Sequence, residues 1–216
     1  MKMKLPATVN TFVDRHAYGL KNELVGHCMR LGVIVAVLWS IEFIDLILWG
    51  VDLDRYGIHP RTWVGLRNIG LAPFLHYGFF HLLANTIPFF LLGLLVMLRG
   101  VRQFVYVSIL AALISGLGVW IFGAAYTVHL GISGVIFGYM GFLLGYGYLE
   151  RSIQSIVLAV LAFFFYGGML WGVFPLAPGV SWLGHLFGLI GGGLAAYWQI
   201  RRTNRLWVSG NVVIGK

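Results

Sequence analysis

Charged side chains are scarce in this sequence. Asp, Glu, Lys and Arg make up only 10% of its 216 residues, whereas 59% of the residues are hydrophobic and the mean hydropathy is +0.86. A soluble domain normally carries about 25% charged residues, so most of this surface cannot face water. The hydrophobic residues recur in runs of about 20, the length that a helix needs to cross about 30 Å of hydrocarbon. The composition therefore predicts an all-α, polytopic protein of the lipid bilayer.

Cysteine and acidic residues are also few. Cys28 is the single cysteine, which excludes an internal disulfide framework. Seven acidic residues stand against 15 basic ones, for a formal net charge of +8. We do not interpret this excess as nucleic-acid binding, because the basic residues lie between the hydrophobic runs, where they orient membrane proteins.

Six of the hydrophobic runs are long enough to span a bilayer as helices. We predict spans at residues 31–49, 79–98, 101–122, 132–149, 153–174 and 182–200. The chain then consists of a cytoplasmic N-terminal segment (1–30), a six-span core (31–200) and a cytoplasmic tail (201–216). The only long connection, residues 50–78, contains an amphipathic stretch around residues 63–66 and is expected to lie on the outer face of the membrane.

The distribution of Lys and Arg predicts the orientation. Twelve of the 15 lie before span one or in the segments that follow spans two, four and six. The other three are Arg55, Arg61 and Arg67, all in the long first loop. Because cytoplasmic segments carry the positive charge, both termini are expected in the cytoplasm. No signal-peptide pattern is found at the N-terminus, and a prokaryotic plasma membrane is the expected location.

Polar side chains occur at the outer ends of three spans, where burial in lipid is costly and marks candidates for function. His76, His81 and Asn85 lie at the start of span two, Ser133 at the start of span four, and His185 at the start of span six. All three spans enter from the outer side, so these groups lie within about 10 Å of the same surface.

Glycine spacing indicates which spans touch. Small residues recur at helical period in span four (Gly134, Gly138, Gly141, Gly145) and in span six (Gly184, Gly188, Gly191 or Gly192, Ala195). Two such faces favour close backbone contact. Packing them together would put the Ser133 hydroxyl beside the His185 imidazole.

This pairing predicts acyl-transfer chemistry. Ser133 would be the nucleophile, and His185 the general base and then the general acid. The unpaired backbone N–H of Ser133 at a helix N-terminus, with His81 and Asn85 four residues apart on one face, would hold an oxyanion. Taken singly, a serine between glycines is usually a packing residue, and a membrane histidine usually satisfies an interhelical hydrogen bond. Their coincidence in depth and on adjoining faces favours catalysis.

A serine triad would also need a carboxylate. Glu150 lies about 25 Å along the helix from Ser133, and only Glu42 and Asp45 fall well inside a predicted span. We therefore predict a Ser–His dyad, with Glu42 and Asp45 in structural hydrogen bonds. Loss of activity in a well-folded Asp45→Asn variant would indicate a triad instead.

At these residues the chain resembles the rhomboid family of intramembrane serine proteases. The matching motifs are Gly131–Ile132–Ser133–Gly134, His81–Leu82–Leu83–Ala84–Asn85, and Gly184–His185 with Gly188. The resemblance implies a catalytic dyad, an oxyanion hole that includes His81 and Asn85, and a structural role for His76. It also implies no metal and no cofactor, substrates that are single-span membrane proteins, and gating by displacement of span five and an adjoining outer loop.

The sequence departs from that family in two places. Phe137 stands where several bacterial members have a tyrosine that stacks on the catalytic histidine, and Arg67–Asn68 stands where they have a Trp–Arg pair. The aromatic stack is expected to persist without a hydroxyl. In span five, Gly167–Gly168 is interpreted as a packing feature in preference to a bend.

Three other classes of function agree less well with the sequence than a protease does. An inactive rhomboid-like protein that binds membrane clients would typically lack the serine or the histidine, and both are present here. A transporter would need internal repeats and charges along a full transmembrane path, which the sequence does not show. A soluble hydrolase with a G-x-S-x-G elbow is excluded, because Val135 occupies the final glycine position and no strand precedes Ser133.

Overall fold

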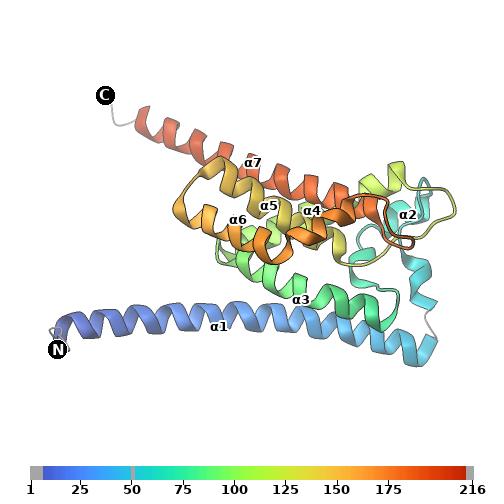
Figure 1. Ribbon diagram of the computed structural model, residues 1–216, viewed down its shortest axis with the longest axis horizontal. Coiled ribbons are helices and arrows are strands. Elements are labelled where there is room, and N and C mark those ends of the chain that lie inside the picture. The colour runs from blue at the N-terminus through green and yellow to red at the C-terminus, as the bar shows by residue number, and fades with distance from the viewer. Residues whose placement is uncertain (1–6, 50–51, 213–216) are drawn as a thin grey trace.

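The computed structural model describes residues 7–49 and 52–212. Within these ranges the chain is helical, and its only β-pairing is one isolated antiparallel bridge between Ile58 and His129. Six long helices form the body: α1 (Ala7–Ile44), α3 (Gly78–Met97), α4 (Val101–Phe122), α5 (Ser133–Glu150), α6 (Ile153–Tyr166) and α7 (Trp182–Val212). In Figure 1, α1 runs along the outside and α3 lies between it and the rest of the bundle.

Four helical segments of the described chain are long and apolar enough to cross a membrane: Gly19–Ile47, Gly78–Met97, Val101–Phe122 and Ile153–Val173. The other two predicted spans are present as the helices α5 and α7, but their composition does not reach that level of hydropathy. In α5, glycine and tyrosine take the place of aliphatic residues, and this helix packs against protein on most sides. Twelve of its 18 residues are buried.

The first and last helices extend beyond the predicted spans. α1 begins at Ala7, far before residue 31, so most of the predicted N-terminal segment is helical, while residues 1–6 lie outside the described part of the chain. After Ile44 it continues as a π-helix over Asp45–Trp49. α7 continues past residue 200 to Val212, and residues 213–216 of the predicted tail lie outside the description.

The long first loop is ordered by short helices and hydrogen bonds. It contains a 3₁₀-helix (Asp52–Tyr56), α2 (Trp63–Asn68) and a second 3₁₀-helix (Ala72–Phe74). At the position of the departure from the family pattern, the buried Asn68 side chain donates to the Gly57 carbonyl at 3.1 Å. Arg61 donates to the Gly123 carbonyl at 2.6 Å, which fastens the loop to the end of α4.

The glycine faces of α5 and α7 pack against each other as predicted. A Cβ atom on Gly188 would overlap the carbonyl oxygen of Gly134, and one on Gly192 would overlap that of Gly138. Gly192 therefore faces α5, whereas Gly191 faces Ala111 and Ile114 of α4. Only glycine permits this backbone approach, because any side chain would push the helices apart.

The predicted span five is not one α-helix. α6 ends at Tyr166, and a 3₁₀-helix (Gly167–Val173) follows. The packing interpretation of the glycine pair there is wrong: a Cβ on Gly168 would meet no atom within 4 Å, and one on Gly167 would meet only the Phe163 ring of its own segment. The change of helix type redirects the backbone so that the Gly172 carbonyl reaches α7.

We expect Gly192→Ala to destabilise the fold and Gly193→Ala to leave it intact. The first substitution forces a methyl group into the α5 backbone, and overpacking of this kind costs about 1–3 kcal/mol. At Gly193 a Cβ would meet no atom within 4 Å, so the higher helix propensity of alanine should be neutral or stabilising. Thermal unfolding of both variants in detergent tests this, and equal melting temperatures would contradict the close approach of α5 and α7.

Candidate active site

Ser133 and His185 are brought together at the end of the α5–α7 contact where both helices begin. Ser133 is the first residue of α5, His185 lies in the first turn of α7, and Ser133 Oγ is 2.9 Å from His185 Nε2. His185 Nδ1 is 2.9 Å from the Gly172 carbonyl oxygen. Because a carbonyl oxygen only accepts, Nδ1 carries the proton and Nε2 is free to accept from the serine hydroxyl. This is the tautomer that a general base needs.

An aromatic ring holds the imidazole from one side. The rings of Phe137 and His185 are stacked, with centroids 4.1 Å apart and planes inclined by 8°. Gly172 lies against both rings, since a Cβ there would lie 3.0 Å from Phe137 Cζ and 3.1 Å from His185 Nδ1. The ring orientation is therefore fixed by one stack and one backbone hydrogen bond. Sequence reasoning missed Gly172, because a backbone carbonyl has no signature in the residue types.

His81 and Asn85 lie on the wall of a cavity of about 580 Å³ that is also lined by Ser133 and His185. The Tyr77 amide donates to His81 Nδ1 at 3.2 Å, so a neutral His81 carries its proton on Nε2 and can donate with it. Asn85 Nδ2 donates one hydrogen to the His81 carbonyl at 2.9 Å and keeps a second. The start of α5 has no side-chain cap, which leaves first-turn N–H groups beside Ser133. Three kinds of donor thus border one cavity.

The loop before Ser133 is held by His76. The Ile132 amide donates to His76 Nε2 at 3.3 Å, and burial together with the neighbouring His81 ring lowers the pKa of His76 to about 3. His76 is therefore neutral at physiological pH and can accept this bond. Gly131 has a φ of 111°, and a Cβ there would lie 2.9 Å from His81 Cε1. Glycine is thus required both by the backbone conformation and by the close His81 ring.

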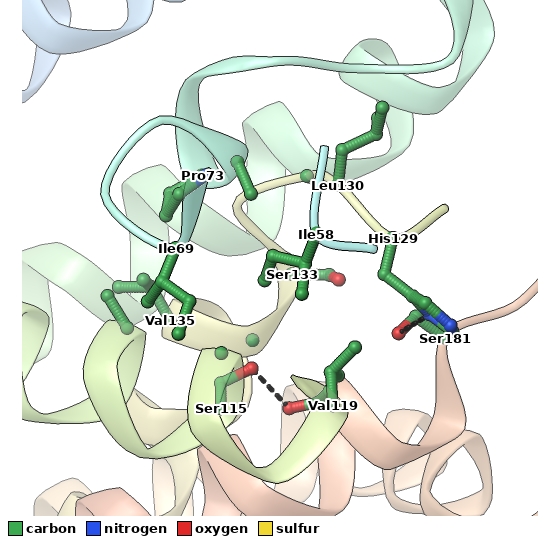
Figure 2. Close-up of a pocket in the computed structure, with 16 residues that line it drawn as sticks. Ile58, Ile69, Pro73, Ser115, Val119, His129, Leu130, Ser133, Val135 and Ser181 are labelled. Carbon is green, nitrogen blue, oxygen red and sulfur yellow. Dashed lines mark hydrogen bonds between the residues drawn. The ribbon is translucent and has the colours of Figure 1, made fainter. Parts of the chain in front are cut away.

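A second, smaller cavity of about 30 Å³ lies beside Ser133 (Figure 2), about the size that one water molecule needs. Ser115 of α4 lies on its wall and donates to the Gly184 carbonyl at 2.8 Å. A Cβ on Gly134 would overlap the Ser115 hydroxyl. Because the motif glycines Gly134 and Gly184 have no side chains, α4 can pack closely against the site.

His129 links two loops at the rim of the site. Its Nε2 is 2.8 Å from Thr127 Oγ1 and its Nδ1 is 2.8 Å from Ser181 Oγ, so it joins the segment before α5 to the segment before α7. Figure 2 shows the His129 and Ser181 side chains together at the cavity edge. Burial lowers the pKa of His129. Sequence reasoning did not single out either residue, since both lie between the predicted spans.

Within the described residues, no carboxylate hydrogen-bonds to His185: its Nδ1 is bonded to the Gly172 carbonyl and its Nε2 to Ser133 Oγ. Asp45 is buried and accepts from the Leu53 amide at 3.0 Å, as expected for a structural hydrogen bond, and Glu42 is buried as well. Within the described residues, no group of three His, Cys, Asp or Glu side chains is arranged to hold a metal ion.

Comparison with known proteins identifies the family to which the sequence is similar. The family model of the Rhomboid domain matches residues 65–202 of this chain. The uncharacterized protein Rv1337 of Mycobacterium tuberculosis is 42% identical over 171 residues, which cover 76% of this chain and 71% of the relative. The uncharacterized protein ML1171 of Mycobacterium leprae is 40% identical over 76% of this chain and 67% of its own. A protein of Bacillus subtilis named "Putative rhomboid protease YdcA" is 28% identical over 79% of this chain and 86% of its own.

The carboxylates near the end of α1 predict a pH dependence of stability. Burial and the nearby Asp45 raise the pKa of Asp54 to about 6, against about 4 in an unfolded chain. The folded state therefore holds this proton more tightly, and stability falls as pH rises from about 4 through about 6. We expect Asp54→Asn to raise the melting temperature at pH 7.5 and not at pH 4.

Glu23→Gln, which removes an equal charge from an exposed position on α1, is the control for this change. An equal gain at both pH values, or the same gain in Glu23→Gln, would contradict the assignment to Asp54.

Proposed function

The chain belongs to the rhomboid family, and from this premise we propose that it is an intramembrane serine endopeptidase that uses a Ser133–His185 dyad. One observation carries the proposal: the 2.9 Å contact between Ser133 Oγ and His185 Nε2, in an imidazole whose Nδ1 proton is engaged by the Gly172 carbonyl. The same histidine can then take the serine proton and return it. Its Nδ1–H stays bonded throughout both transfers.

The reaction follows from these roles. Ser133 Oγ attacks the scissile carbonyl carbon while its proton passes to His185 Nε2. His185 then donates that proton to the leaving amine, and an acyl ester remains on Ser133. Water attacks the ester, His185 again accepts a proton, and the acid product is released as the proton returns to Ser133.

The positive imidazolium that forms in each step needs stabilisation without a carboxylate. The Gly172 carbonyl oxygen accepts from Nδ1–H, and the Phe137 ring is stacked on the imidazole with the two ring centroids 4.1 Å apart. Both interactions favour the charged ring. The stack with Phe137 thus supports the base as well as orienting it.

The developing oxyanion is assigned to donors that border the same cavity. The candidate donors are the Ser133 amide at the uncapped start of α5, the His81 Nε2–H and the second Asn85 Nδ2 hydrogen. Donors fixed before the reaction need no reorganisation when the charge appears, which is the main source of such stabilisation.

We further propose that six helices cross the membrane, with both termini in the cytoplasm. α5 is largely buried among the other helices, and α7 packs along α5 and α4, so a lower hydropathy than that of the four apolar segments is compatible with a transmembrane course. The outward apolar residues of the first loop, such as Trp63 at 85% exposure and Leu71 at 50%, support its placement on the membrane surface. The proposed substrates are single-span membrane proteins cut in or beside their helix.

Cleavage of a single-span substrate with small residues near its outer end is expected in liposomes. Ser133→Ala and His185→Ala should each lower the rate by about 10³-fold or more, because a nucleophile and its base act as one unit. Ser40→Ala is the control: its hydroxyl is bonded only to its own helix, at the Ala36 carbonyl, and its rate should equal that of the wild type.

Thermal unfolding of every variant separates lost chemistry from lost folding. Cleavage that persists in Ser133→Ala would contradict the mechanism. No cleavage by the wild type, across several substrates, would favour the alternative of a catalytically inactive rhomboid-like protein that binds membrane clients.

A further inference from the structure

A basic cavity of about 350 Å³ lies at the end of the bundle opposite to Ser133. It is formed where the first turn of α4 meets the C-terminal part of α7. Arg102 and Tyr106 line it from α4, and Trp198, Gln199 and Arg202 line it from α7. The catalytic proposal uses none of these residues.

The positive charge of this cavity is uncompensated. Within the described part of the chain, neither Arg102 nor Arg202 forms a hydrogen bond or an ion pair, and no acidic residue lines the cavity. By contrast, Arg99, which lies just before α4, forms an ion pair with Glu150 at 2.8 Å. The first turn of α4 has no side-chain cap, so its unpaired N–H groups add a partial positive charge. The cavity is therefore suited to an anion.

Gln199, which also lines the cavity, differs from the arginines in the partner that its side chain needs. The amide oxygen of Gln199 is buried and has no hydrogen-bond partner in the described chain. An oxygen of this kind requires a donor, and a bare phosphate at neutral pH offers few. An anion that also carries hydroxyl groups would satisfy both the arginines and Gln199.

The surroundings place this ligand at a membrane interface. Tyr106 and Trp198 are 39% and 45% exposed, as aromatic residues at the level of lipid headgroups commonly are. Along α4 toward the membrane centre, Val105 and Ile109 are 47% and 57% exposed and offer an apolar track for an acyl chain. A ligand with a charged head and an apolar tail matches this sequence of surfaces.

We propose that this cavity binds the headgroup of an anionic, hydroxyl-bearing phospholipid such as phosphatidylglycerol. The phosphodiester lies between Arg102 and Arg202, a headgroup hydroxyl donates to Gln199, and an acyl chain follows Val105 and Ile109. The proposal is independent of the protease assignment, because it concerns other residues and a binding equilibrium.

Native mass spectrometry of the full chain in a neutral detergent, titrated with phosphatidylglycerol, tests the proposal. We expect the dissociation constant to rise about five-fold in Arg202→Gln and about thirty-fold in Arg102→Gln/Arg202→Gln. Arg201→Gln is the matched control, since Arg201 stacks on Tyr197 at 4.7 Å and does not line the cavity. Its affinity should stay within two-fold of the wild type. Melting temperatures without lipid confirm that the variants fold.

Three outcomes would overturn the proposal. Equal losses in Arg201→Gln and Arg202→Gln would mean that surface charge alone attracts the lipid. Equal affinity for phosphatidylcholine would remove the role of net negative charge. Equal affinity for glycerol 1-phosphate, which has the phosphate and hydroxyls but no acyl chains, would assign the cavity to a soluble phosphate ester.

Discussion

Direct contact between the backbones of α5 and α7 is the constraint on which the rest of the structure depends. The carbonyl oxygens of Gly134 and Gly138 occupy the space that side chains on Gly188 and Gly192 would need. Glycine contributes little hydropathy, so α5 and α7 are less apolar than the other long helices. Those other helices supply most of the apolar surface that a lipid bilayer requires. At the end where both helices begin, the same contact aligns their first turns, and Ser133 and His185 meet there. Packing and chemistry thus share one set of residues.

Hydrogen bonds and one aromatic stack hold most polar side chains of the site, although within the described residues the buried Nδ1 of His76 has no partner. His185 is held by Gly172 and Phe137, His81 by the Tyr77 amide, Asn85 by its own helix, and the Ile132 amide by His76. These bonds lower the cost of placing polar atoms in a low-dielectric region. They also fix tautomers and orientations before any substrate binds. In the part of the chain that the structure describes, no carboxylate hydrogen-bonds to His185, and a buried charge there would need its own compensation.

Much of this arrangement could be predicted from residue spacing. Glycines at helical period indicated the α5–α7 contact, and the shared depth of Ser133, His185, His81 and Asn85 indicated one site. The remainder depends on backbone geometry. The Gly172 carbonyl reaches His185 only because the helix changes type after Tyr166, and the Gly167–Gly168 pair was misinterpreted for the same reason. The extension of α1 to Ala7 depends on packing, and so does the choice between Gly191 and Gly192 as the residue that faces α5. The number of membrane spans depends on how far α5 and α7 are shielded from lipid.

The central claim is that His185 activates the Ser133 hydroxyl, and covalent labelling tests it most directly. The folded protein in detergent would be treated with a fluorophosphonate probe, which modifies activated serines, and the labelled peptide identified by mass spectrometry. The account predicts an adduct on Ser133 that disappears in a folded His185→Ala variant. A wild-type Ser133 that stays unlabelled, or one that is labelled equally without His185, would contradict it.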